Sequence, residues 1–209
     1  MHIAIEGIKG SGKSTILGNM VAQKDSVQSG TSLFSITSPM YSGHPLENMH
    51  HNFPALREND AFMEHLFRER AHWNQIHCKK SPVILGDRSI VTSYVTRWER
   101  WQDPYYTIGR VNAQYENIMK PDVIIWLNST VEAASVNIAA RKTKELGQRE
   151  EKANSLILAK DIYQELFKDR LLLRKGFKCQ IVEVGCCGNS HETTSEITSI
   201  FDYYSKNFT

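Results

Sequence analysis

Cysteine is scarce in this chain, and its cysteines follow neither a metal-binding nor a disulfide pattern. The four residues stand at positions 78, 179, 186 and 187. Cys186 and Cys187 are adjacent, so no pair has the CxxC spacing of a zinc site. A chain of 209 residues can bury a core of its own and does not depend on disulfides. We therefore expect reduced thiols, as in a cytoplasmic protein.

Long apolar runs and an excess of charge of one sign are also missing. No run approaches the roughly 18 apolar residues of a membrane span. The first residues, MHIAIEG, lack the basic and then apolar pattern of a signal peptide. Lys and Arg total 25 against 23 Asp and Glu, a net charge of +2. Bulk charge therefore gives no indication of a nucleic-acid or membrane partner, and we expect a soluble cytoplasmic protein.

Glycine and proline are few, at 12 and 6 residues, and the chain shows no repeat and no low-complexity tract. With 41% hydrophobic and 23% charged residues, the composition is globular and excludes collagen-like or disordered structure. No stretch has the composition of a linker. We therefore expect a single domain over residues 1–209.

Five short apolar runs rich in Val and Ile predict strands that are buried on both faces. Longer segments with helical spacing lie between them. Strands that alternate with helices predict an α/β domain with a mainly parallel sheet. The expected strands are 2–6, 33–37, 82–86, 122–127 and 180–184, and the expected helices are 13–22, 60–78, 90–101, 104–119, 131–146, 152–174 and 191–206.

The segment GIKGSGKS, residues 7–14, fits the phosphate-binding pattern GxxxxGK[ST] in full. It follows the first expected strand and opens the first expected helix, which is where the mechanism of this loop requires it. Glycines let backbone N–H groups curl around phosphate oxygens, and the helix N-terminus adds its dipole. The lysine can reach the β- and γ-phosphates, and the following hydroxyl can ligate Mg²⁺. The expected ATP site consists of Gly7, Lys9, Gly10, Ser11, Gly12, Lys13, Ser14 and Thr15.

An acid and an arginine follow the third expected strand, in the phrase VILGDRS. Ligands of open α/β sheets bind at this carboxyl end of the strands. Asp87 can hold a water on Mg²⁺, which makes it a metal candidate with Ser14, or accept a proton from an acceptor oxygen. Arg88 can clamp an acceptor phosphate with paired N–H groups. Alone the pair would be a surface feature of little weight, but a phosphate loop one strand away favours a role in phosphoryl transfer.

These motifs together resemble the thymidylate kinase family. Residues 6–15, EGIKGSGKST, match that family's EGxxGxGKST, and Asp87-Arg88 matches its DR motif. A pair of small hydroxyl residues, Thr92 and Ser93, follows the DR motif as it does in the family. The resemblance continues to about residue 175. It includes a proline-aspartate phrase before an apolar strand, KPDVIIWL, and an arginine-bearing segment that ends in QREE.

The resemblance implies a P-loop NTPase domain with α/β/α layers, a five-stranded parallel sheet and a helical lid at 141–152. It also implies ATP and Mg²⁺ as cofactors, a small-molecule nucleotide acceptor and a homodimer. The implied reaction moves the γ-phosphoryl group of ATP to the 5′-phosphate of dTMP or a close variant. Lid arginines would neutralise charge while the lid excludes water. A solvated helix face is the alternative interpretation of this segment. The implied catalytic residues are Lys13, Asp87, Arg88, Arg141 and Arg149.

On the acceptor side the sequence departs from the family pattern. Lys9 stands where the family has an acid that touches the sugar hydroxyl, and a lysine cannot accept that hydrogen bond. Arg97 stands where a glutamine reads the thymine edge. The arginine of the REPG phrase is absent from TSPMY, which leaves Arg57, Arg68 and Arg70 as candidates for the phosphate clamp. The expected acceptor-binding residues are Phe67, Arg70, Arg88, Ser93 and Arg97.

Two other functions remain open at this point. Asp87-Arg88-Ser89 is similar to the Glu-Arg-Ser phrase of deoxynucleoside kinases, which phosphorylate a 5′-hydroxyl and would use Asp87 as a base. A P-loop NTPase that acts as a switch is the third possibility. The chain has no NKxD-type guanine phrase, and the DR and lid residues would be surplus to a simple switch.

Overall fold

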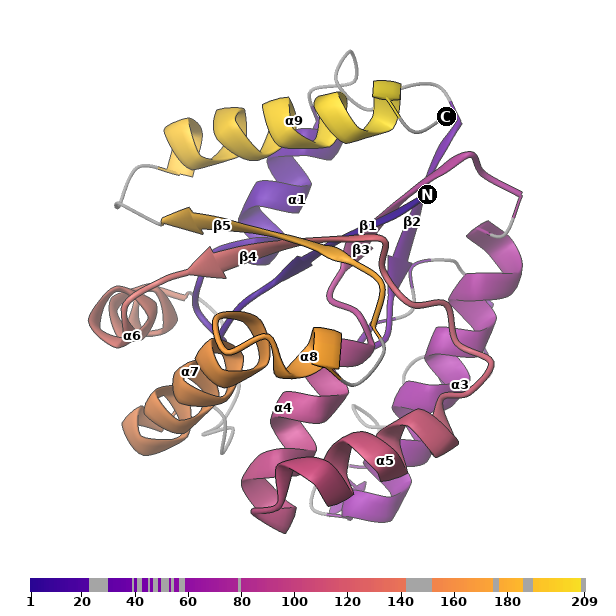
Figure 1. Cartoon of the computed structure of the whole chain (residues 1–209), viewed down its shortest axis with the longest axis vertical. Coiled ribbons are helices and arrows are strands. Elements are labelled where there is room, and N and C mark those ends of the chain that lie inside the picture. The colour runs from indigo at the N-terminus through magenta and orange to yellow at the C-terminus, as the bar shows by residue number, and fades with distance from the viewer. Residues whose placement is uncertain are drawn as a thin grey trace.

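A five-stranded sheet forms the centre of the protein, and all of its strands are parallel. The strand order is β2-β3-β1-β4-β5, so the first strand lies in the middle (Figure 1). The strands are β1 (His2–Glu6), β2 (Thr31–Ser35), β3 (Val83–Asp87), β4 (Val123–Asn128) and β5 (Gln180–Gly185). The computed structural model describes residues 1–22, 30–38, 40, 43, 44, 46, 49, 53, 55, 56, 59–78, 80–141, 152–174, 177–185 and 190–207.

Helices cover both faces of this sheet, which gives three α/β/α layers (Figure 1). Two of them, α1 and α9, lie on one face, and α3, α4, α5, α7 and α8 lie on the other, while α6 follows the carboxyl end of β4. None of the described helices has the length and apolar character of a bilayer-spanning segment. The helices are α1 (Lys13–Ala22), α3 (Asp60–Cys78), α4 (Ile90–Trp101), α5 (Pro104–Gln114), α6 (Val131–Ala139), α7 (Ala153–Phe167), α8 (Leu171–Arg174) and α9 (Ser190–Asn207).

The alternation of side chains along β1 divides the core into two apolar clusters. Ile3 and Ile5 belong to the cluster under α1 and α9, which also contains Phe201. Ala4, between them, points to the opposite face, where the larger cluster contains Trp126 and residues of α4, α5 and α7. Glu6 ends β1 on that second face, so the chain places a carboxylate beneath α4 and α7.

The parallel α/β fold predicted from the sequence is confirmed, and every predicted strand lies within two residues of its observed bounds. The largest shift is in β2, which ends at Ser35 although the apolar run predicts a strand over 33–37. The hydroxyl of Ser35 accepts hydrogen bonds from the backbone N–H groups of Thr37 and Ser38, at 3.1 and 3.2 Å. A side chain that bonds its own following backbone competes with the strand ladder, so the chain turns there.

One predicted helix, 104–119, is too long, because α5 ends at Gln114. Beyond this end, the side chain of Gln75 on α3 forms hydrogen bonds with the backbone. Its amide nitrogen donates to the carbonyl of Asn117 at 2.8 Å, and its oxygen accepts from the N–H of Met119 at 2.6 Å. A tertiary partner thus satisfies polar groups that a longer helix would have bonded internally.

Two further helices are shorter than predicted. The helix expected at 131–146 ends at Ala139, and residues 142–151 lie outside the described part of the chain. The segment expected as one helix at 152–174 is divided into α7 and α8. Arg170 separates the two with a left-handed φ of 56°, a conformation that no α-helix contains.

A buried histidine lies at the start of the central strand. His2 is only 3% exposed, packs edge-on against Phe34 and crosses Gly86 of β3. A Cβ on that glycine would lie 2.7 Å from Nε2 of His2, so the ring fits only because β3 has no side chain there. Burial lowers the pKa of His2 to about 4, against the opposing influence of Asp122.

This pKa predicts a loss of stability in mild acid. The folded protein keeps His2 neutral down to about pH 4, whereas the unfolded chain takes up the proton near its ordinary value of 6.5. Above pH 6.5 the protonation of His2 therefore does not affect the free energy of unfolding. As the pH falls from 6.5 towards 4, this free energy decreases by about 3 kcal/mol. Denaturant unfolding at several pH values measures it. A His2→Phe variant, which carries no titratable ring, is expected to show a flatter profile over this interval, and an equally steep one would contradict the assignment.

Candidate active site

The loop between β1 and α1, residues 7–14, is shaped by close contact with α6. Gly10 adopts a left-handed φ of 84°. A Cβ there would collide with the carbonyl oxygen of Ala134, so no other residue fits. Asn137 of α6 donates a hydrogen bond to the carbonyl of Gly10 at 2.9 Å. The glycine is thus required both for the turn and for the approach of the helix.

Lys13 lies at the centre of this loop and is almost completely buried. Its ammonium group donates hydrogen bonds to the carbonyls of Gly7 and Ile8, at 2.8 and 2.7 Å, and to the hydroxyl of Ser11 at 3.0 Å. Burial, together with the positive charge of Arg88, holds the pKa of Lys13 well below its usual range. A phosphate anion beside the ammonium group would relieve both effects.

Arg88 follows β3 in a backbone conformation that is unusual for a residue with a side chain. Its φ is 72°, and its backbone N–H donates to the carbonyl of Ile5 at 3.1 Å. Its guanidinium donates through Nη1 to the hydroxyl of Thr92 at 3.1 Å. The sheet therefore fixes the backbone of Arg88, and α4 receives its side chain.

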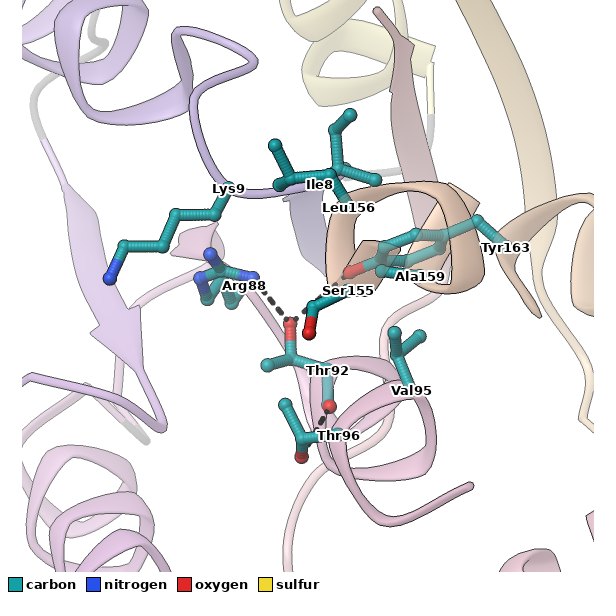
Figure 2. Close-up of a pocket in the computed structure, with 11 residues that line it drawn as sticks. Ile8, Lys9, Arg88, Thr92, Val95, Thr96, Ser155, Leu156, Ala159 and Tyr163 are labelled. Carbon is teal, nitrogen blue, oxygen red and sulfur yellow. Dashed lines mark hydrogen bonds between the residues drawn. The ribbon is translucent and has the colours of Figure 1, made fainter. Parts of the chain in front are cut away.

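A pocket lies between the loop, α4 and α7 (Figure 2). The volume of this pocket, including the part that is open to solvent, is about 450 Å³. Lys9 and Arg88 line it on the loop side, and Thr92 of α4 faces Ser155 and Tyr163 of α7. Two cations and several hydroxyl groups at the carboxyl end of a parallel sheet form a site suited to an anionic ligand.

Few oxygen ligands for a cation lie near this loop, and they are hydroxyl and carboxylate oxygens, which bind hard cations. Ser14 and Thr15 are exposed in the first turn of α1, and Asp87 is half-buried at the end of β3. Within the described residues, no three His, Cys, Asp or Glu side chains gather as a metal site. A hydroxyl and a carboxylate fit Mg²⁺, because this ion takes most of its ligands from phosphates and water.

The structure separates the predicted acceptor residues into two groups. Ser93 and Arg97 are buried one turn apart on α4, and Nη2 of Arg97 lies 3.9 Å from the carboxylate of Glu64 on α3. Arg70 is also buried, but its Nη1 donates to the carbonyl of Thr37 at 2.9 Å, so it supports the segment that follows β2. Of these residues only Arg88 lines the pocket in Figure 2.

The remaining acceptor and lid candidates are placed only in part. Phe67 is half-buried on α3, and Arg68 bonds the neighbouring residues His65 and Glu69. Arg141 follows α6 and lies near enough to the loop for its charge to lower the pKa of Lys13. Arg57, Arg149 and the rest of the expected lid except Lys152 lie outside the described residues.

Two residues that hold this region together by hydrogen bonds were not predicted from the sequence. Asn74 of α3 is fully buried and organises the turn after β2. Its amide nitrogen donates to the carbonyls of Ser35 and Ser38, at 2.6 and 2.9 Å, and its oxygen accepts from the N–H of Met40 at 3.0 Å. Tyr163 of α7 bonds Glu6 at the end of β1. Neither stands in a motif, so no local signal distinguishes them from ordinary helix residues.

The comparisons with known proteins identify the fold. No protein-family model matches the chain, and no curated protein matches it. Among solved structures it is similar to deoxyadenosine kinase from M. mycoides with bound dATP, at 19% identity and a TM-score of 0.63. A structure of the same kinase with the products dCMP and a flexible dCDP bound has 17% identity and a TM-score of 0.62. Each match covers 97% of this chain and 100% of the other. The chain therefore has the P-loop α/β fold of these kinases.

The contact between Gly10 and α6 predicts a sharp difference between two glycine-to-alanine changes. Gly10→Ala is expected to lower the free energy of unfolding by about 2 kcal/mol or more, because its Cβ meets backbone at a left-handed φ. Gly18 lies in α1, where an added Cβ would meet no atom within 4 Å. Gly18→Ala is therefore the matched control, expected to be neutral or up to about 1 kcal/mol more stable. If Gly10→Ala and Gly18→Ala had equal free energies of denaturant unfolding, the close contact between Gly10 and α6 would be contradicted.

Proposed function

We propose that this protein is a P-loop kinase that transfers the γ-phosphoryl group of ATP to the 5′-hydroxyl of a deoxynucleoside. The observation that carries the proposal is the meeting of three groups at one edge of the sheet. Asp87 and Arg88 lie close enough to Lys13 for the charge of each to shift the pKa of its ammonium group. A loop lysine, a carboxylate and an arginine are the groups that phosphoryl transfer requires.

Each group has a defined part in the proposed reaction. Lys13 and the backbone N–H groups of the loop bind the β- and γ-phosphates, and α1 directs its N-terminus at them. Arg88 neutralises charge that develops on the transferred group. Mg²⁺, when bound by Ser14 and Asp87, would add further neutralisation of the phosphates. Arg141 and Arg149 stay predicted contributors of positive charge.

Asp87 supports a hydroxyl as acceptor. A 5′-hydroxyl must lose its proton during transfer, and a carboxylate beside the loop can accept it. Asp87 is half-buried at the end of β3, directly before Arg88. The similarity of fold to deoxyadenosine kinase structures along almost the whole chain supports the same acceptor class.

A thymidylate kinase-like activity is the second candidate. Lys9 and Arg88 both line the pocket beside the loop, and two cations suit an acceptor that already carries a phosphate. In that reaction the acceptor oxygen needs no base. Asp87 would then serve Mg²⁺ alone.

A panel of acceptors tests these proposals. ADP release from Mg·ATP is measured with thymidine, deoxyadenosine and deoxycytidine and with the three corresponding 5′-monophosphates. We expect turnover on at least one nucleoside, and a loss of at least about a hundred-fold in Lys13→Ala, because its ammonium group contacts phosphate. Turnover on monophosphates alone would replace the first proposal with the second. If none of these six acceptors, and neither deoxyguanosine nor its 5′-monophosphate, is phosphorylated by protein that still binds ATP, both proposals are overturned.

Asp87→Asn distinguishes the two roles of this carboxylate. If it accepts the hydroxyl proton, kcat is expected to fall about 10²- to 10⁴-fold, and added Mg²⁺ does not restore it. Asp103→Asn is the matched control, since Asp103 caps α5 through the N–H of Tyr106 and asparagine caps equally well. Recovery of Asp87→Asn at high Mg²⁺ would instead assign the residue to the metal.

A further inference from the structure

The carboxylate of Glu6 is fully buried at the end of β1, directly before the phosphate-binding loop. Its Oε1 accepts hydrogen bonds from the backbone N–H and the hydroxyl of Ser89, both at 2.7 Å. Its Oε2 accepts from the hydroxyls of Thr92 and Tyr163, at 2.8 and 2.9 Å. A buried carboxylate with this many donors is costly to disturb, because each lost partner leaves charge unsolvated.

This arrangement determines the direction of the Thr92 hydroxyl. A carboxylate only accepts hydrogen bonds, so the single hydrogen of Thr92 points to Glu6. Its lone pairs are then free to accept from Nη1 of Arg88, 3.1 Å away. Figure 2 shows the Thr92 hydroxyl between the guanidinium of Arg88 and the hydroxyl of Tyr163. Glu6 thereby turns Thr92 into an oriented acceptor for Arg88.

Tyr163 completes the same polar cluster from α7. Burial and the negative charge of Glu6 raise the pKa of Tyr163 far above its usual range, so its hydroxyl keeps its hydrogen and donates it. Its oxygen also lies 3.5 Å from that of Thr92. With Tyr163 as a donor, the second oxygen of Glu6 has two partners and a fixed position.

Glu6 also holds the backbone around Arg88. Ser89 donates its N–H and its hydroxyl to Glu6, and the same hydroxyl accepts from the N–H of Val91 as the N-cap of α4. The left-handed φ of Arg88, at 72°, is a conformation that persists only where the surroundings determine it. The residue is thus held at its backbone through Ser89 and at its guanidinium through Thr92.

We infer that Tyr163, Glu6 and Thr92 position the guanidinium of Arg88 for phosphoryl transfer. Tyr163 fixes the buried carboxylate of Glu6, Glu6 orients the Thr92 hydroxyl, and Thr92 accepts the hydrogen bond from Arg88. The inference rests on the proposed function. It adds a requirement that the loop and DR motifs do not contain: α7 must supply a hydroxyl to the end of β1. An arginine oriented before the phosphate arrives needs no reorganisation during transfer.

Tyr163→Phe tests this role, with Tyr94→Phe as the matched control. Tyr94 is also fully buried and also donates one hydrogen bond, to Asn112 at 2.6 Å, so both changes remove the same chemical group. We expect kcat to fall about ten-fold in Tyr163→Phe, with the KM for ATP within about two-fold of wild type. Tyr94→Phe is expected to leave both constants unchanged.

Substitutions of Thr92 give a second comparison, which stands even if Tyr163→Phe fails to fold. Thr92→Ser keeps the hydroxyl that receives Arg88, whereas Thr92→Val keeps the shape and removes it. We expect Thr92→Ser to retain kcat and Thr92→Val to lose about ten-fold or more. Equal losses in the two variants would indicate packing alone and overturn the positioning role.

An NMR measurement separates this inference from the proposed function. The side-chain N–H signals of Arg88, assigned by their loss in Arg88→Lys, are expected to shift or broaden in Tyr163→Phe and to stay unchanged in Tyr94→Phe. If the wild-type protein turns over no acceptor, the proposed function fails. The spectra then still show whether Tyr163 orients the guanidinium of Arg88. If the wild type is active and Tyr163→Phe matches Tyr94→Phe in both kcat and spectrum, the positioning role is wrong.

Discussion

The burial of one carboxylate beneath two helices determines how this site is assembled. Glu6 ends the central strand on the face that α4 and α7 cover, and water cannot reach it. Its oxygens must therefore be satisfied by the protein, and the donors come from Ser89, Thr92 and Tyr163. The end of β1, the start of α4 and the middle of α7 are brought together by this requirement, and the glycine-rich loop between β1 and α1 begins at the next residue.

The loop itself is held from the other side by α6. Gly10 leaves room for the backbone at Ala134, and Asn137 bonds its carbonyl. Between these two supports Lys13 is buried against loop carbonyls, with Arg88 near enough to lower its pKa. Positive charge is concentrated here before any ligand binds, which costs stability and favours an anion.

On the acceptor side, two of the predicted arginines have partners within the protein. Arg70, one of the candidates for the phosphate clamp, is buried and donates to the carbonyl of Thr37. Arg97, expected at the base edge, lies 3.9 Å from Glu64 of the neighbouring helix. Both side chains offer only donors, and each has found an acceptor within the protein. Spacing along the chain places each arginine on its helix and turn, but it does not identify the carbonyl or carboxylate that receives it.

Local sequence patterns were enough to predict the α/β fold, the strand that precedes the loop and the glycines that shape it. Apolar runs indicate buried strands, and a left-handed φ is one that Gly10 adopts easily. Long-range packing supplied the rest: Gln75 of α3 ends α5, Asn74 organises the turn after β2, and Tyr163 reaches Glu6. The last pair is separated by 157 residues. A hydrogen bond of that kind depends on the packing of whole helices, and no pattern of neighbouring residues encodes it.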